Sequence, residues 1–257
     1  MLFSWEMITV APWETALFVT CVFLAGIVRG AIGFGFSALV IASTSLFMNP
    51  SMVVPLLILL EIAASVHMMF SIWNDTLWKT TLYLSIGTLV TTPIGVYVLS
   101  VAPEDALRLI IALVIFVMTL LYMRGVAYKG TLNSRTLTFV GCISGLFNGM
   151  AAVGGLFIAI FLASAKLPIR SVRATVVAFF LVAEIIFLIS ASAADVYNAR
   201  IFNTFFLACI PMFIGIIVGT RLFNRLDEKK LRRLVLVVLI VLSVIGLIRS
   251  GYGFMFT

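Results

Sequence analysis

Six uninterrupted apolar runs, each about the 20 residues needed to cross a bilayer, dominate this 257-residue sequence. They occupy residues 52–72, 78–100, 105–124, 172–192, 201–222 and 230–249. Hydrophobic residues make up 63% of the chain and charged residues only 11%, and no soluble domain of this size buries so much apolar surface. The runs therefore predict an all-α polytopic membrane protein, with lipid as the solvent along most of the chain.

Two further apolar regions, 13–48 and 133–165, are too long for a single membrane helix. Each is interrupted near its middle by glycines, namely Gly30, Gly33 and Gly35 in the first region and Gly149, Gly154 and Gly155 in the second. We expect each region to form a helical hairpin, in which two shorter helices are joined by a glycine-rich bend. The sequence leaves open whether the hairpins are re-entrant or cross the membrane fully.

The two halves of the chain resemble each other. GIVRGAIGFG (26–35) matches GLFNGMAAVG (145–154) at an offset of 119, and GVYVLSVAPEDALRL (95–109) matches GTRLFNRLDEKKLRR (219–233) at an offset of 124. Two motifs in the same order at nearly the same offset predict an internal duplication. The N-terminal repeat would comprise residues 1–128 and the C-terminal repeat residues 129–257, each with one hairpin and three full spans.

The basic residues predict how the two repeats are oriented. If both hairpins return to the side from which they enter, Arg29 stays in the membrane and the other Lys and Arg residues divide thirteen to three. The cytoplasmic side then holds Lys79, Arg124, Lys129, Arg135, Lys166, Arg170, Arg173, Arg221, Arg225, Lys229, Lys230, Arg232 and Arg233, and the outer side holds Arg108, Arg200 and Arg249. Hairpins that crossed once would move the 166–173 and 221–233 clusters outside. The positive-inside rule favours the returning hairpins.

This arrangement inverts the second repeat relative to the first and places both termini outside. Inverted repeats with interrupted helices that meet near the bilayer midplane are typical of secondary transporters.

The residues around the two bends are candidates for anion binding. Arg29 lies just before the first bend, and Asn148 takes the equivalent place in the second repeat. A helix that begins after a bend exposes free N–H groups and a partial positive charge, which suits an anion. The predicted substrate-binding residues are Arg29, Gly33, Gly35, Ser37, Asn148, Gly154 and Gly155. Two alternatives stay open: the glycines could serve close helix packing, and Arg29 could form a structural ion pair with Glu61.

Three other ionisable groups lie well inside predicted spans, namely Glu61, His67 and Glu184. A carboxylate removed from water takes up a proton more readily, so these residues are candidates for proton coupling. The alternative is a neutral acid that hydrogen-bonds to a neighbouring helix. For His67 the structural role is favoured, because a residue six positions after Glu61 faces another side of the helix.

The sequence contains no arrangement of residues typical of an enzyme. The single histidine and the cysteines Cys21, Cys142 and Cys209 have no partners at metal-ligand spacing. We therefore expect no catalytic activity, no metal and no cofactor. The net charge of +7 arises in short loops between apolar runs, which is a pattern of membrane orientation rather than of nucleic-acid binding. The expected partners are lipid and a small anion, and the sequence leaves homo-oligomerisation open.

Three stretches together resemble the sulfite exporter TauE/SafE family of membrane permeases. They are GIVRGAIGFGFSALV (26–40), GCISGLFNGMAAVGGLFIAIFL (141–162) with Pro168 soon after, and GTRLFNRLDEKKLRRLVLVVLIVLSVIGLI (219–248). The resemblance covers essentially the whole chain. It implies a transporter of small anions, often sulfur-containing ones such as sulfite, thiosulfate or organosulfonates, in a bacterial inner membrane.

One departure from the family pattern leaves the substrate open, because the second glycine-rich run often ends in a proline, and AAVGGLFIAIFL has none there. Two other functions also stay open, a passive anion channel and a membrane assembly or scaffold subunit.

Overall fold

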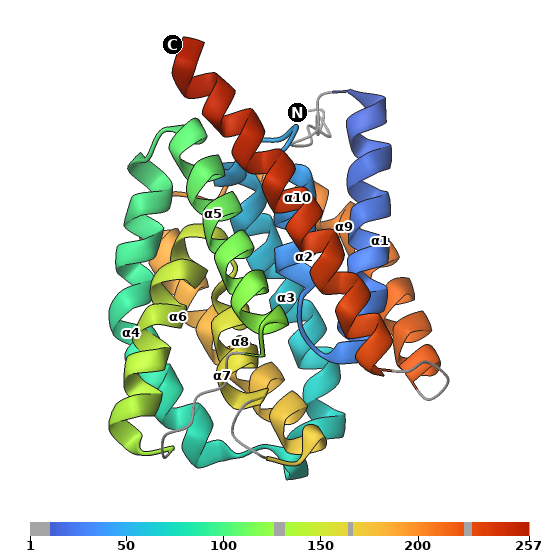
Figure 1. Cartoon of the computed structure of the whole chain (residues 1–257), viewed down its shortest axis with the longest axis vertical. Coiled ribbons are helices and arrows are strands. Elements are labelled where there is room, and N and C mark those ends of the chain that lie inside the picture. The colour runs from blue at the N-terminus through green and yellow to red at the C-terminus, as the bar shows by residue number, and fades with distance from the viewer. Residues whose placement is uncertain (1–10, 126–131, 164–166, 224–227, 257) are drawn as a thin grey trace.

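Every regular element in the described part of the chain is a helix. The computed structural model describes residues 11–125, 132–163, 167–223 and 228–256 (Figure 1). The helices are α1 (Pro12–Ile32), α2 (Phe36–Thr44), α3 (Pro50–Ile72), the 3₁₀ helix η1 (Trp73–Asp75), α4 (Trp78–Val101), α5 (Glu104–Met123), α6 (Ser134–Ala151), α7 (Gly154–Ala163), α8 (Ile169–Ala193), α9 (Ala199–Phe223) and α10 (Glu228–Phe256). The predicted all-α fold is confirmed.

Seven helices in these ranges, α1, α3, α4, α5, α8, α9 and α10, are long and apolar enough to cross a membrane. Each of the six predicted runs coincides with one of them, and α1 is the seventh. With 21 residues, α1 is about 30 Å long, whereas α2 and α7 have only 9 and 10 residues. The chain is therefore an integral multi-pass membrane protein whose hairpins each contain one helix too short to span.

The polar residues at several helix starts explain where these helices begin. The Glu14 carboxylate accepts a hydrogen bond from the Ala11 N–H at 3.1 Å, before the first turn of α1. The side chains of Asn49 and Asn133 accept bonds from the backbone N–H groups of Ser51 and Thr136, at the starts of α3 and α6.

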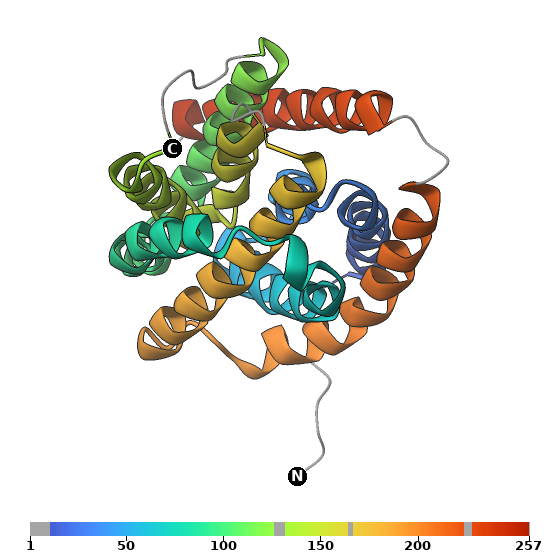
Figure 2. The same cartoon turned by 90° about the horizontal axis from the view of Figure 1, so that it is seen from below.

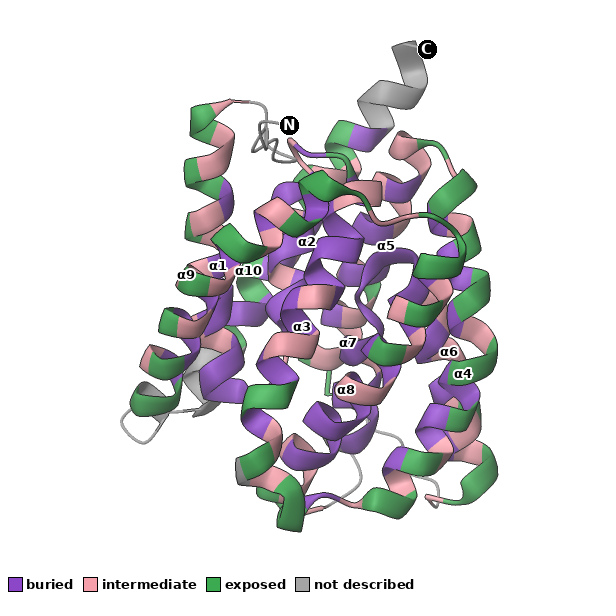
Figure 3. Ribbon diagram, turned by 180° about the vertical axis from the view of Figure 1, so that it is seen from behind, coloured by how far each residue is buried: buried purple, intermediate pink, exposed green. Residues whose placement is uncertain are grey.

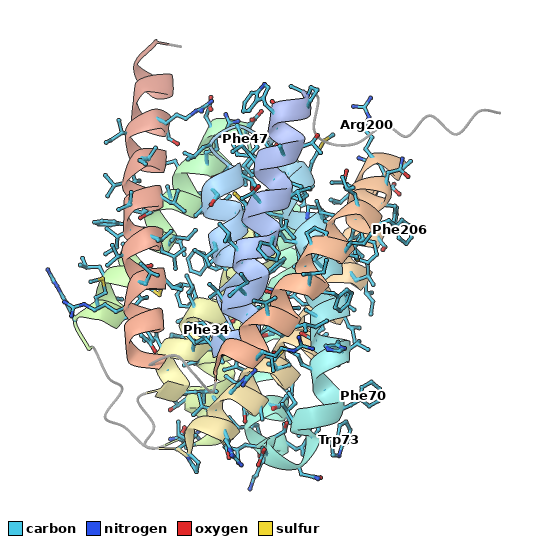
Figure 4. The ribbon with its side chains drawn as sticks, turned by 90° about the vertical axis from the view of Figure 1, so that its right-hand side faces the viewer. Phe34, Phe47, Phe70, Trp73, Arg200 and Phe206 are labelled. Carbon is cyan, nitrogen blue, oxygen red and sulfur yellow. The ribbon has the colours of Figure 1, made fainter. Side chains whose placement is uncertain are left out.

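Aromatic side chains mark the two ends of the bundle. Trp13 packs on Phe47 at one end, with ring centroids 6.0 Å apart, and Trp73 packs on Trp78 at 4.5 Å. Figure 4 shows Phe47 near the upper end and Trp73 near the lower end. Such rings sit at membrane–water interfaces, so the two pairs indicate the boundaries of the lipid-facing band.

The first hairpin returns to the end from which it enters, because Phe47, after α2, contacts Trp13 at the start of α1. Helix α1 begins and α10 ends at the same end of the bundle (Figure 1). Which side of the membrane this end faces stays a prediction. Of the basic residues on which that prediction rests, Lys129, Lys166 and Arg225 lie outside the described residues, and the side chains of Lys229, Lys230 and Arg232 are not described.

The centre of the bundle is formed by α2, α3 and α8. In the most apolar windows of the spans, 67% of α3 and 61% of α8 are buried, against 28% of α10. Viewed along the bundle (Figure 2), α2 and α3 lie inside, whereas α9 and α10 lie at the edge. Figure 3 shows the same division, with buried residues concentrated on the inner helices. Lipid-exposed residues on the outer helices include Leu89, Phe206 and Ile248.

The helices pack in reciprocal pairs. Helix α1 packs on α9, and α6 packs on α4, while α3 pairs with α8 and α5 with α10. If helices α6 to α10 correspond in order to α1 to α5, the α1–α9 contact of one repeat is equivalent to the α6–α4 contact of the other. The α3–α8 and α5–α10 contacts then join corresponding helices of the two repeats. This pattern supports the inverted repeat, which stays a prediction.

Glycines let the paired helices approach each other closely. A Cβ atom at Gly87 of α4 would lie 2.0 Å from the Thr138 carbonyl oxygen of α6. Across the same contact, the Thr88 hydroxyl donates to the Gly141 carbonyl at 3.0 Å. Small residues serve such backbone contacts in membrane proteins.

We expect Gly87→Ala to lower the stability of the protein by about 1–3 kcal/mol, because the added methyl group forces the two backbones apart. Thermal unfolding in detergent measures the effect. Gly246→Ala is the matched control, since its methyl group would meet a single side-chain atom, the Ala112 Cβ, at 3.1 Å. Equal melting temperatures for the two variants would contradict the expectation.

Candidate functional site

The first bend lies at Gly33 and Gly35, as predicted from the sequence. Both residues have left-handed φ angles, 90° and 92°, which glycine adopts without strain. The Gly33 N–H donates to the Arg29 carbonyl at 2.8 Å and ends α1. Figure 4 shows Phe34, between the two glycines, below the middle of the molecule and inside the bundle.

The second bend does not lie at the predicted glycines. It lies at Ala152 and Val153, because α6 continues to Ala151 and α7 begins at Gly154. Ala152 has a left-handed φ of 54°, and its N–H donates to the Asn148 carbonyl at 2.9 Å. A left-handed alanine costs about 1 kcal/mol or more, which surrounding structure must offset.

Gly30 and Gly149 also differ from the prediction, since both lie within helices rather than in bends. A Cβ atom at Gly30 would lie 2.2 Å from the Ile216 carbonyl oxygen of α9, and one at Gly149 would lie 2.5 Å from that of Thr92 in α4. For these two glycines the alternative role in helix packing is the correct one.

The two bends meet at one small cavity of about 10 Å³, roughly the space of one water molecule. Gly35, Ser37 and Ala38 line it from the first hairpin, and Ala152, Val153, Gly155 and Leu156 from the second. Glu61 and Phe180 complete the lining. The starts of α2 and α7 therefore face the same space, and both helices direct the positive ends of their dipoles toward it.

Arg29 contacts two of the residues that line this cavity, Glu61 and Phe180. Its side chain is fully buried, and its Nη2 atom is 2.9 Å from the Glu61 Oε2 atom and donates to the Ser65 hydroxyl at 2.9 Å. Its guanidinium carbon lies 4.8 Å from the centre of the Phe180 ring. The Nε and Nη1 atoms have no hydrogen-bond partner among the described residues. Arg29 thus keeps unused donors next to a lining residue of the cavity.

Glu61 connects Arg29 to the cavity. One of its carboxylate oxygens pairs with Arg29, and the other accepts a hydrogen bond from the Ser37 hydroxyl at 2.6 Å. Removing one partner of such a buried pair leaves an uncompensated charge and costs several kcal/mol. The ion pair foreseen as an alternative for Arg29 is therefore present, and it occupies the wall of the same cavity.

Asn148 forms a second buried pair, with Glu184. Its amide Nδ2 donates to the Glu184 carboxylate at 3.3 Å, and both residues are 1% exposed. The amide oxygen of Asn148 has no hydrogen-bond partner among the described residues. Neither residue lines the cavity, and neither do Gly33 or Gly154. Gly154 instead accepts a hydrogen bond from the Ser144 hydroxyl at 2.9 Å.

His67 takes no part in this site. It is exposed on α3 and contacts the Phe213 ring edge-on, with centroids 5.7 Å apart. The residues of the site that were not predicted from the sequence include Ser65 and Phe180, besides the lining residues Ala38, Ala152, Val153 and Leu156. The predicted repeat contains a signal for the first two, because at the offset of 119 Ser65 corresponds to Glu184, and Phe180 corresponds to Glu61.

Comparison with known proteins gives one match. The family model described as sulfite exporter TauE/SafE matches residues 18–245, which includes both bends and both buried carboxylates. No curated protein and no solved structure matches the chain.

Proposed function

Because the chain belongs to the sulfite exporter TauE/SafE family of membrane transporters for sulfite-type anions, we propose that it moves a small sulfur-containing anion by secondary transport through the cavity between its two bends. Sulfite, thiosulfate and small organosulfonates are the candidate substrates. The observation that carries the proposal is that two helix starts line one cavity, beside a buried arginine that pairs with the lining residue Glu61.

The chemistry of this space suits an anion. The starts of α2 and α7 offer N–H groups without partners inside their own helices. Arg29 adds a full positive charge, and its unused Nε and Nη1 donors can form charge-assisted hydrogen bonds with oxyanion oxygens. The cavity of about 10 Å³ is too small for sulfite. The anion therefore binds in a wider conformation, in which the hairpins have separated.

Glu61 gives the site a way to couple the anion to a proton. While Glu61 is ionised, it neutralises Arg29 and puts a negative charge on the wall of the cavity. A proton on Glu61 removes that charge and frees Arg29 for the substrate. Anion and proton then bind together, and a proton gradient can drive transport. Glu184 is the second candidate for this coupling, because it is the other carboxylate buried in the spans and is held by Asn148.

We place the protein in the bacterial inner membrane with both termini outside, since this orientation leaves most Lys and Arg residues in the cytoplasm. The reciprocal packing of α1 on α9 and α6 on α4 supports two inverted repeats, an architecture that allows a central site to open to each side in turn.

The test is uptake into proteoliposomes of labelled sulfite, thiosulfate and an alkylsulfonate, with and without a pH gradient. We expect saturable uptake of at least one of them, which an inward-directed proton gradient raises. Flux that neither saturates nor responds to the gradient would instead indicate a passive channel. Absence of transport, with no thermal stabilisation by any of the anions, would indicate an assembly or scaffold subunit.

A further inference from the structure

The tip of the first hairpin, residues 30–35, is held by side chains from the second half of the chain. The Arg173 Nη2 atom of α8 donates to the Gly30 carbonyl at 2.8 Å, and the Thr220 hydroxyl of α9 donates to the same carbonyl at 3.4 Å. The stem of Arg173 also packs on Gly33, where a Cβ atom would lie 2.6 Å from the Arg173 Cγ atom. The tip is therefore attached across the two halves.

The Gly30 carbonyl suits a cationic partner. It belongs to the last turn of α1, where carbonyl groups have no N–H partner within the helix and where the helix dipole places partial negative charge. A hydrogen bond from a guanidinium to such a carbonyl is charge-assisted. Arg173 is half-buried, so water competes with this bond less than it would at the surface.

The contact lies between the cavity and the lower end of the bundle in Figure 4. The Leu77 N–H donates to the Thr175 hydroxyl at 3.1 Å, which places the start of α8 beside the Trp73–Trp78 pair at this end. Phe180 follows Arg173 by seven residues on the same face of α8, about 10 Å further into the bundle, and lines the cavity. An anion that moves between the cavity and the lower end must therefore pass the tip.

The base of the same hairpin is attached differently. The Arg108 Nε atom of α5 donates to the Ser45 carbonyl, directly after α2, at 2.9 Å. This contact lies within the first half of the chain. Loss of the Arg173 bond would therefore free the tip, whereas the base would stay in place.

The second hairpin has no equivalent of this contact in the predicted repeat. At the offset of 119 Val54 corresponds to Arg173, and at the offset of 124 Val96 corresponds to Thr220. A valine side chain has no hydrogen-bond donor. The contact is thus particular to the first hairpin.

We propose that Arg173 is a positioning residue for transport, which holds the first hairpin closed over the cavity, an inference that rests on the proposed function. With the Arg173–Gly30 bond formed, the cavity measures about 10 Å³ and is too small for the anion. Opening toward the lower end breaks this bond and moves the tip away from α8. Arg173 does not line the cavity, so it acts on the anion site through the hairpin.

The test is the reactivity of a cysteine at Ala38, a buried residue that lines the cavity, in a full-length chain whose native cysteines are replaced by serine. Membrane vesicles of each orientation are treated with a membrane-impermeant thiol reagent. A cysteine at the exposed Asn74, next to Trp73, identifies the vesicles whose lower end faces the reagent. In these vesicles we expect Arg173→Met to make Ala38→Cys react at least about tenfold faster, because methionine keeps the stem and loses the charged donor.

Two variants serve as controls for this experiment. Arg173→Lys keeps a charged donor and is expected to react nearly as slowly as the wild type. Arg170→Met removes the same charge from an exposed position on the first turn of α8, and we expect it to leave the rate unchanged.

A rate in Arg173→Met that equals that of the wild type, that rises equally in Arg170→Met, or that rises only from the opposite side would overturn this role of Arg173. A cysteine at Ala191, buried at the other end of α8, is expected to stay unreactive. If it also reacts in Arg173→Met, the substitution loosens the whole fold, and the role is again overturned. These measurements need no substrate. Failure of the wild type to bind or transport any of the anions would overturn the proposed function separately.

Discussion

We expect Arg29→Gln to weaken anion binding roughly 10- to 100-fold and to destabilise the protein, whereas the double variant Arg29→Gln/Glu61→Gln recovers stability without recovering binding. The single substitution leaves Glu61 buried without its cation, at a cost of about 3–5 kcal/mol. The second substitution removes the stranded charge and retains a side chain that can accept the Ser37 hydrogen bond. Anion binding stays weakened, because the fixed positive charge is absent from both variants.

This pair of variants separates the two roles considered for Arg29. If Arg29 only pairs with Glu61, removing both charges restores everything that depends on the fold, including anion binding. If Arg29 also binds the anion, the loss is about 1.5–3 kcal/mol of binding energy, or roughly 10- to 100-fold in Kd. Thermal unfolding with and without sulfite measures both quantities in one experiment. A double variant that binds the anion as tightly as the wild type would leave Arg29 with a structural role alone.

The predictions from the sequence succeeded where hydrophobicity and charge are enough. Long apolar runs located the six spans, since a membrane helix must be predominantly apolar along its length. Arg29 and Glu61 stood out because charged groups inside a membrane are expensive and need a partner, and the two are indeed paired at 2.9 Å. The first bend was found because glycine is the residue that adopts a left-handed φ without strain.

The second bend could not be found in the same way, because Ala152 and Val153 look like ordinary membrane-helix residues. Only tertiary packing holds an alanine at φ 54°. Gly30 and Gly149 were wrongly predicted to lie in bends. A glycine that breaks a helix and a glycine that lets two helices touch cannot be told apart in the sequence. The outcome depends on the facing backbone, here Ile216 for Gly30.

Residues that act through a neighbour were also missed. Phe180 is a plain apolar residue in sequence, and it gains importance only where its ring meets Arg29 and the cavity.

We expect anion binding to the wild type to strengthen as the pH falls, and Glu61→Gln to remove this dependence. In the proposed mechanism the proton frees Arg29 from Glu61, so each anion that binds to the ionised form takes up one proton. By linkage the affinity then changes by up to about tenfold per pH unit. Glutamine mimics the protonated acid, so Glu61→Gln is expected to bind tightly at every pH. An alkylsulfonate is the suitable ligand, because its own charge stays constant between about pH 5 and pH 8.

Two further variants identify the carboxyl group that causes the pH dependence of anion binding. Glu104→Gln is the control, because Glu104 is a partly exposed carboxylate that pairs with Arg108 far from the cavity. We expect Glu104→Gln to keep the pH dependence of anion binding that the wild type shows. Glu184→Gln is expected to keep the pH dependence of anion binding, because Glu184 pairs with Asn148 and not with Arg29. If Glu184→Gln flattened the pH dependence and Glu61→Gln did not, the coupling would belong to the Asn148–Glu184 pair, and Glu61 would serve only to neutralise Arg29.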